Sequence, residues 1–107
     1  MSALLIYYKK ELNMEEILKK FNTKFFGPSM EFFRLKYEHT DGEKIFFSCE
    51  FNEMCGNPMG FVQGGMISAA LDDATSAAMI SGYEEKKAPM TTDLHVLFHR
   101  PLPLGKA

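Results

Sequence analysis

The chain has 107 residues, of which 46% are hydrophobic, and a formal net charge of −2 at pH 7. This length suits one domain, and the apolar content is high enough for a packed core, which argues against wholesale disorder. The small negative charge gives no electrostatic reason to expect binding to nucleic acid or to an anionic membrane surface.

The cellular compartment follows from the cysteines and the first apolar run. Cys49 and Cys55 do not form a Cys-x-x-Cys pattern, so we expect two reduced thiols in an intracellular protein. The longest early apolar run, Ala3 to Tyr8, is too short for a signal-peptide core or a membrane span. We therefore expect a cytoplasmic protein with no membrane partner.

The first part of the chain predicts helices. A short helix is expected over residues 2–12, and residues 1–27 together form an N-terminal helical segment of a single domain that spans residues 1–107. Asn13 and Glu16 have the spacing of a capping pair. They precede apolar residues at helical spacing: Met14, Ile17, Leu18 and Phe21. Asn22 and Gly27-Pro28 end this second helix.

A two-residue period follows and predicts a hairpin. Phe33, Leu35 and Tyr37 alternate with charged residues, which is typical of a strand with one buried face. The Asp41-Gly42 pair predicts a tight turn. The return strand is expected over residues 44–51.

The longest element is a helix that begins at Gly64 or Gly65 and ends at about residue 81, before Gly82. It is apolar nearly all round, so we expect it to be the central helix, buried on most sides. A third strand is predicted over residues 91–100, ended by two prolines. These elements predict an α+β domain, with too few strands to cover the helix unless a partner contributes.

The start of this helix and one acid within it suggest chemistry. The first N–H groups of a helix lack intrahelical acceptors and carry partial positive charge, so they can bind an anion or a developing oxyanion. Asp72 lies about two turns further along, where partial desolvation would make it an effective base. The alternatives are a tight loop-to-helix junction without a ligand, and an exposed Asp72 equivalent to Asp73.

With these residues in place, the chain resembles the hotdog-fold acyl-CoA thioesterases of the phenylacetate-degradation type, which are related to the 4-hydroxybenzoyl-CoA thioesterases. The signature of that family is an Asn-x-x-Gly loop, a His-Gly-Gly step into a helix, and an acid nine residues after the His. Residues 57–60 match the loop, residues 63–65 match the step, and Asp72 matches the acid. The similarity covers about residues 32–105. Gln63 replaces the frequent His, and the family's further strands are absent.

The resemblance implies a hotdog fold, in which an antiparallel sheet wraps around a long central helix at about residues 64–81, with the last strands missing. It also implies hydrolysis of acyl-CoA to the free acid and CoA, without a metal or another cofactor. The Gly64 N–H would polarise the carbonyl, Asp72 would act as general base or nucleophile, and Asn57 and Gln63 would orient the thioester. Thr91, with Thr92 as its rival, would hold the water.

The resemblance further implies association. In the family two subunits join their sheets, so Asn57 and Gln63 of one chain would face Asp72 of the other in a homodimer or a homotetramer. CoA phosphates would favour basic residues, and Lys86, Lys87 and Arg100 are available. The alternatives are a non-catalytic acyl or acyl-CoA binding module and an inactive, truncated thioesterase. His95 and His99 lack a third ligand at useful spacing, so we expect no metal site.

Overall fold

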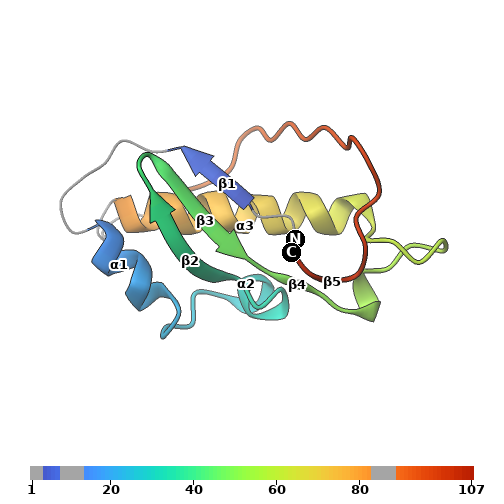
Figure 1. The fold of residues 1–107 in the computed structure, drawn as a ribbon, viewed down its shortest axis with the longest axis horizontal. Helices are drawn as coiled ribbons and strands as arrows, with labels where there is room; N and C mark the ends of the chain where they lie inside the picture. The colour runs from blue at the N-terminus through green and yellow to red at the C-terminus, as the bar shows by residue number, and fades with distance from the viewer. Residues whose placement is uncertain (1–3, 8–13, 83–88) are drawn as a thin grey trace.

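A long helix and two small antiparallel sheets make up the α+β architecture of the chain (Figure 1). The computed structural model describes residues 4–7, 14–82 and 89–107. The elements in chain order are β1 (Leu4–Tyr7), α1 (Met14–Phe21), α2 (Pro28–Phe32), β2 (Lys36–Asp41), β3 (Lys44–Ser48), β4 (Glu50–Phe51), the 3₁₀ turn η1 (Glu53–Cys55), α3 (Gly64–Gly82) and β5 (Gly105–Lys106). The α+β class is therefore confirmed.

The predicted hairpin is confirmed and forms two of the three strands of the larger sheet, whose order is β1-β3-β2. Asp41 pairs with Lys44 across the turn, and Gly42 has a φ of 59°. This left-handed conformation costs glycine nothing, because glycine has no Cβ to clash with the backbone. The strand begins later than predicted, however. Phe33 follows α2 directly, and Arg34, with a φ of 51°, redirects the chain into β2.

The predicted helix over residues 2–12 is wrong for residues 4–7, the part of it that the structure describes. Residues 4–7 form strand β1, which pairs antiparallel with β3, from Leu4 opposite Phe47 to Tyr7 opposite Lys44. An apolar run this short suits a strand as well as a helix, and the open edge of β3 provides its hydrogen-bond partners. The remainder of the expected first helix, and the Asn13 cap, lie outside the described residues. Helix α1 forms as predicted, whereas α2, with Pro28 at its first turn, was not anticipated.

The expected return strand divides at Cys49. Residues before it form β3, and Glu50 and Phe51 form β4, which pairs with Lys106 and Gly105 of β5 in a second sheet. Cys49 and Ala107 extend this pairing, because each backbone N–H donates to the other's carbonyl oxygen, at 2.7 and 2.8 Å. The chain thus passes from one sheet into the other within a single extended segment.

The third predicted strand, residues 91–100, is wrong: this stretch is irregular. Its apolar and polar residues alternate as in a strand, but a strand also needs a neighbouring backbone for its N–H and C=O groups. Within the described part of the chain, such contacts begin only at Leu102, whose carbonyl accepts from the Val62 N–H at 2.9 Å. Residues 89–102 run beside α3 in the opposite direction instead (Figure 1).

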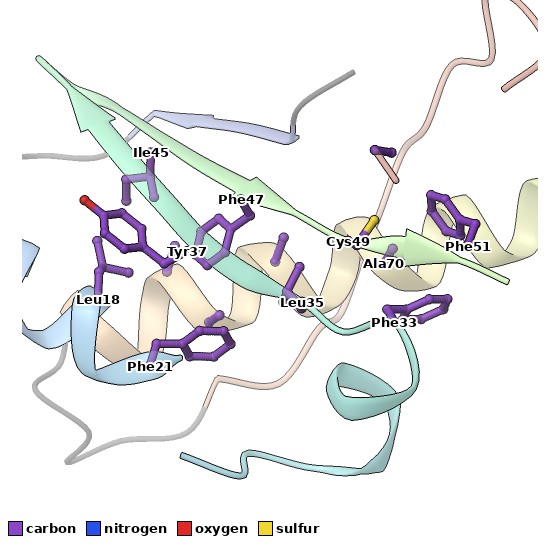
Figure 2. Close-up of a cluster of buried hydrophobic side chains, with 14 of the residues drawn as sticks. Leu18, Phe21, Phe33, Leu35, Tyr37, Ile45, Phe47, Cys49, Phe51 and Ala70 are labelled. Atoms are coloured by element: carbon purple, nitrogen blue, oxygen red, sulfur yellow. The ribbon is translucent and has the colours of Figure 1, made fainter. Parts of the chain in front are cut away.

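The hydrophobic core lies between the sheets and one face of α3 (Figure 2). Phe47 is fully buried, and its ring meets the rings of Phe21 and Tyr37 edge to face. Helix α3 contributes buried residues at helical spacing: Ala70, Ala74, Ala77, Ala78 and Ser81. The expectation that α3 is buried on most sides is therefore wrong for this chain. The other faces of α3 are partly open, and they carry the candidate site residues.

Candidate functional site

The start of α3 is built by Gln63, which acts as its N-terminal cap. The Gln63 carbonyl oxygen accepts from the N–H groups of Met66 and Ile67 at 2.9 and 3.3 Å, and its Oε1 also accepts from Met66, at 3.2 Å. The Gln63 N–H donates to the Cys55 carbonyl at 2.8 Å and ties the helix start to η1. Among the described residues, no acceptor meets the N–H groups of Gly64 and Gly65. These two donors are therefore available to a ligand.

Asn57 folds the loop that precedes this helix start. Its side-chain Oδ1 accepts from the N–H groups of Met59 and Phe61 at 2.9 and 3.0 Å, and its own N–H donates to the Phe61 carbonyl at 2.7 Å. Gly60, with a φ of 85°, completes the turn. The side-chain carbonyl of Asn57 is thus committed to the loop. Its amide Nδ2 is the group that remains to orient a bound carbonyl.

An open cavity of about 450 Å³ lies at the helix start. Asn57 and Gly64 line it together with Phe61, Phe98 and Arg100, whereas the exposed Gln63 side chain is not part of the wall. The Phe98 ring lies so close to Gly64 that a Cβ added there would be 3.3 Å from the ring's Cζ atom. Glycine at this position therefore lets an aromatic ring approach the first turn of the helix.

Asp72 and Thr91, which lie far apart in the sequence, meet in the structure. The Thr91 hydroxyl donates to Asp72 Oδ1 at 2.5 Å and fixes the start of the 89–102 segment to α3. Both residues line a second open cavity, of about 530 Å³, together with Ser76, Thr92 and Asp93. Thr91, rather than its rival Thr92, is thus the hydroxyl that contacts the acid. A water in this cavity could meet a carboxylate and a hydroxyl at once.

Asp73 has a different environment from Asp72, although the two are adjacent. Its Oδ2 atom is buried and, within the described residues, has no hydrogen-bond partner. Burial raises the pKa of Asp73, and the charge of Asp72 raises it further, while a hydrogen bond with Ser29 of α2 acts in the opposite direction. Asp73 therefore faces the packed interior beside α2, and Asp72 faces the open cavity. The structure separates two carboxylates that the sequence left as alternatives.

The predicted site residues thus form two groups along one helix. Gly64 and Asp72 are eight residues apart on α3, which corresponds to about 12 Å at 1.5 Å per residue. Asn57, Gln63 and Gly64 lie at the helix start, and Asp72 and Thr91 lie beyond the second turn. A carboxylate at that distance cannot activate a water for a carbonyl held at the helix start of the same chain.

Several other candidates are clarified by the structure. His99 and Arg100 line the cavity at the helix start, while Lys86 and Lys87 lie outside the described residues. In the described part of the chain, no three His, Cys, Asp or Glu residues are grouped so that they could hold a metal ion. Both cysteines are buried and free, and burial raises the pKa of Cys49 to about 11.

Phe98 is a residue whose position the sequence did not reveal, because its strand pattern gave no sign of contact with α3. The glycine at position 64 was the available signal, since glycine marks a close approach to the backbone.

The described segments also contain no helix that is long and apolar enough to cross a membrane. Comparison of the chain with protein-family models, curated proteins and solved structures gives no match.

Proposed function

We propose that this chain is a hotdog-type acyl-CoA thioesterase, which hydrolyses an acyl-CoA to the free acid and CoA. The observation that carries the proposal is the hydrogen bond from Thr91 to Asp72 in an open cavity, on the same helix whose glycine start offers free N–H donors. These are the two components that thioester hydrolysis requires: an activated water, and donors for the oxygen that becomes negative.

The proposed reaction has two steps. Asp72 takes a proton from a water that the Thr91 hydroxyl helps to hold, and the water oxygen attacks the thioester carbonyl carbon. The carbonyl oxygen becomes an oxyanion, stabilised by the N–H groups of Gly64 and Gly65. The carbon–sulfur bond then breaks, and the CoA thiolate leaves with the electron pair and takes up the proton that Asp72 had accepted, which restores the carboxylate. The Asn57 amide and Arg100 lie on the same cavity as Gly64 and would orient the carbonyl and the CoA phosphates.

The two groups of residues are about 12 Å apart along α3, so the proposal requires a second copy of the chain. In a twofold dimer with α3 helices antiparallel and side by side, Asp72 of one copy would lie near Gly64 of the other. Two equivalent sites would form, each with the acid of one chain and the helix start of its partner. A homotetramer of two such dimers would preserve these sites.

A non-catalytic acyl or acyl-CoA binding module is the second candidate. It is favoured by one observation: among the residues that the structure describes, none in the wall of the cavity at the helix start carries a carboxylate. A monomer would then bind the acyl carbonyl at the Gly64 N–H without a base close enough to activate a water.

Hydrolysis of an acyl-CoA panel by the wild type and by Asp72→Asn tests the proposal. Asn keeps the size and polarity of Asp but cannot accept the proton, so kcat should fall by about 10²–10⁴-fold, the usual contribution of a general base. Asp93→Asn is the matched control, because Asp93 lines the same cavity. It should leave kcat unchanged. Equal rates for the wild type and Asp72→Asn would refute the mechanism, and binding without turnover in the wild type would favour the second candidate.

A further inference from the structure

Helix α2 contributes no buried residue to the core. It has only five residues, and Met30, which packs against the core, is half-buried. A helix this short is not stable without tertiary contacts, because its first turn costs more conformational entropy than its few hydrogen bonds return. The Phe33 N–H donates to the Ser29 carbonyl and the Leu35 N–H to the Met30 carbonyl, both at 3.0 Å. These hydrogen bonds therefore persist only while α2 stays docked on its neighbours.

The chain bends sharply on both sides of α2, where it joins α1 and β2 (Figure 1). Gly27, immediately before the helix, has a φ of 152°, and Arg34, just beyond it, has a φ of 51°. Positive φ is open to glycine and uncommon for a residue with a Cβ. Phe33, between α2 and Arg34, is buried and anchors this end in the core. Bends at the ends of an element are the positions where a change of φ and ψ can move it.

Asp73 lies at the contact between α2 and α3. Ser29 of α2 hydrogen-bonds to its carboxyl group, whereas the buried Oδ2 atom has no partner among the described residues. An ionised carboxylate in this position loses hydration that nothing replaces, and a neutral carboxyl group loses much less. The negative charge of Asp72 opposes ionisation as well. Docking of α2 therefore favours the protonated form of Asp73.

The groups that act on Asp73 come from α2 and from α3 itself. Helix α1 and strand β1 also pack on α3, but within the described chain the groups that shift the pKa of Asp73 are Ser29 and Asp72. Glu31, the acid of α2, is exposed and lines a groove beside Arg34 and not the contact with α3. The charge state of this contact is thus set by Asp73 and modified by Asp72.

We propose that α2 is a pH-sensitive flap, which is docked on α3 while Asp73 is protonated and is released as Asp73 ionises. Burial raises the pKa of Asp73 above its ordinary 3.8, so this contribution to docking is present at acidic pH and is lost as the pH rises through the raised pKa. Release widens the groove beside α2, whose lining includes Phe21, Met30 and Leu35, and admits water to this edge of the core. It requires neither a substrate nor a second copy of the chain.

Hydrogen exchange of the backbone amides at about pH 4 and about pH 7 tests the flap. Dividing each measured rate by the intrinsic rate at the same pH gives the equilibrium constant of opening. For the N–H groups of Phe33 and Leu35, this constant should rise about fivefold or more between the two pH values, since an unpaired buried polar group is costly. The amides of β3, the central strand of its sheet, should stay at least about tenfold better protected at both values.

Four variants distinguish titration of Asp73 from a general effect of pH. Asp73→Asn keeps the size of the side chain but cannot ionise, so the α2 opening constants should be equal at the two pH values. Asp73→Ala serves the same purpose if the asparagine variant folds poorly. Asp72→Asn removes only the neighbouring charge and should reduce the pH effect without abolishing it. Glu31→Gln is the matched control, because it neutralises an exposed acid of α2 itself, and it should keep the full wild-type effect.

Equal α2 opening constants at both pH values in the wild type would overturn the flap. A pH effect of wild-type size in both Asp73 variants, or its loss in Glu31→Gln, would also overturn it. Exchange of the α2 amides only together with those of β3 would show that α2 does not move separately, and would contradict the proposal as well.

Discussion

The hydrogen bond between Thr91 and Asp72 predicts how much the free energy of unfolding falls in Thr91→Val. Valine has nearly the shape of threonine but cannot donate to Asp72 Oδ1, which the Thr91 hydroxyl meets at 2.5 Å. A hydrogen bond to a charged group contributes about 1.5–3 kcal/mol. Thr91 is exposed, so solvent competes for this bond, and we expect about 1 kcal/mol to be lost from the free energy of unfolding. Urea denaturation monitored by circular dichroism measures this difference.

Thr92→Val is the matched control for this prediction. Thr92 is the next residue in the chain and lines the same cavity, but it has no hydrogen bond to Asp72. Its replacement should leave the free energy of unfolding within about 0.5 kcal/mol of the wild-type value. A double-mutant cycle with Asp72→Ala should give a coupling energy of about 0.5–1.5 kcal/mol for Thr91 and none for Thr92. Equal losses for both valine variants, or additivity of Thr91→Val with Asp72→Ala, would refute the contact.

Two further predictions concern the neighbouring acid and the helix start. Burial raises the pKa of Asp73 above its ordinary 3.8, so the protonated side chain stabilises the folded state more than the ionised one does. This contribution to the free energy of unfolding is lost as the pH rises through the folded-state pKa. Asp73→Asn should therefore gain about 1 kcal/mol over the wild type near neutrality and little at about pH 4, and an equal difference at both pH values would contradict the assignment. Gly64→Pro removes the proposed oxyanion donor at a helix position that tolerates proline, and kcat should fall by about 10²–10³-fold. Gly64→Ala is its control, since it adds a Cβ near Phe98 but keeps the N–H, and equal losses in both variants would indicate steric blocking instead.

The elements that the sequence predicts correctly carry their signals locally. Gly42 marks the hairpin turn, and the spacing of Leu18 and Phe21 marks α1, so neither needs knowledge of the distant chain. Strand β1 and residues 91–100 depend on partners instead. Leu4–Tyr7 becomes a strand because it pairs with β3, and residues 91–100 remain irregular because no described strand pairs with them. Alternation indicates which residues could form a strand, but only tertiary pairing decides whether one forms.

The candidate site likewise combines features that the sequence indicates locally with features that depend on tertiary contacts. The sequence named Asp72 and Thr91 as candidate site residues, and the structure brings their side chains into contact. Motif spacing could not show that the Asn57 side-chain carbonyl is used inside its own loop, or that Gln63 caps α3. Such hydrogen bonds depend on the exact path of the backbone. The difference between Asp72 and Asp73 likewise depends on what packs beside each carboxylate, which for Asp73 is α2, an element that the sequence did not predict.

The central proposal is a site shared between two chains, in which Asp72 of one copy acts at the helix start of the other. The most direct test mixes Asp72→Asn with Gly64→Pro, refolds the two together, and measures hydrolysis of hexanoyl-CoA. A mixed dimer would contain one site with both defects and one intact site. Half of the dimers in an equal mixture should be mixed, so activity should recover to about a quarter of the wild-type value. Activity that only equals the average of the two variants measured separately would contradict the shared site.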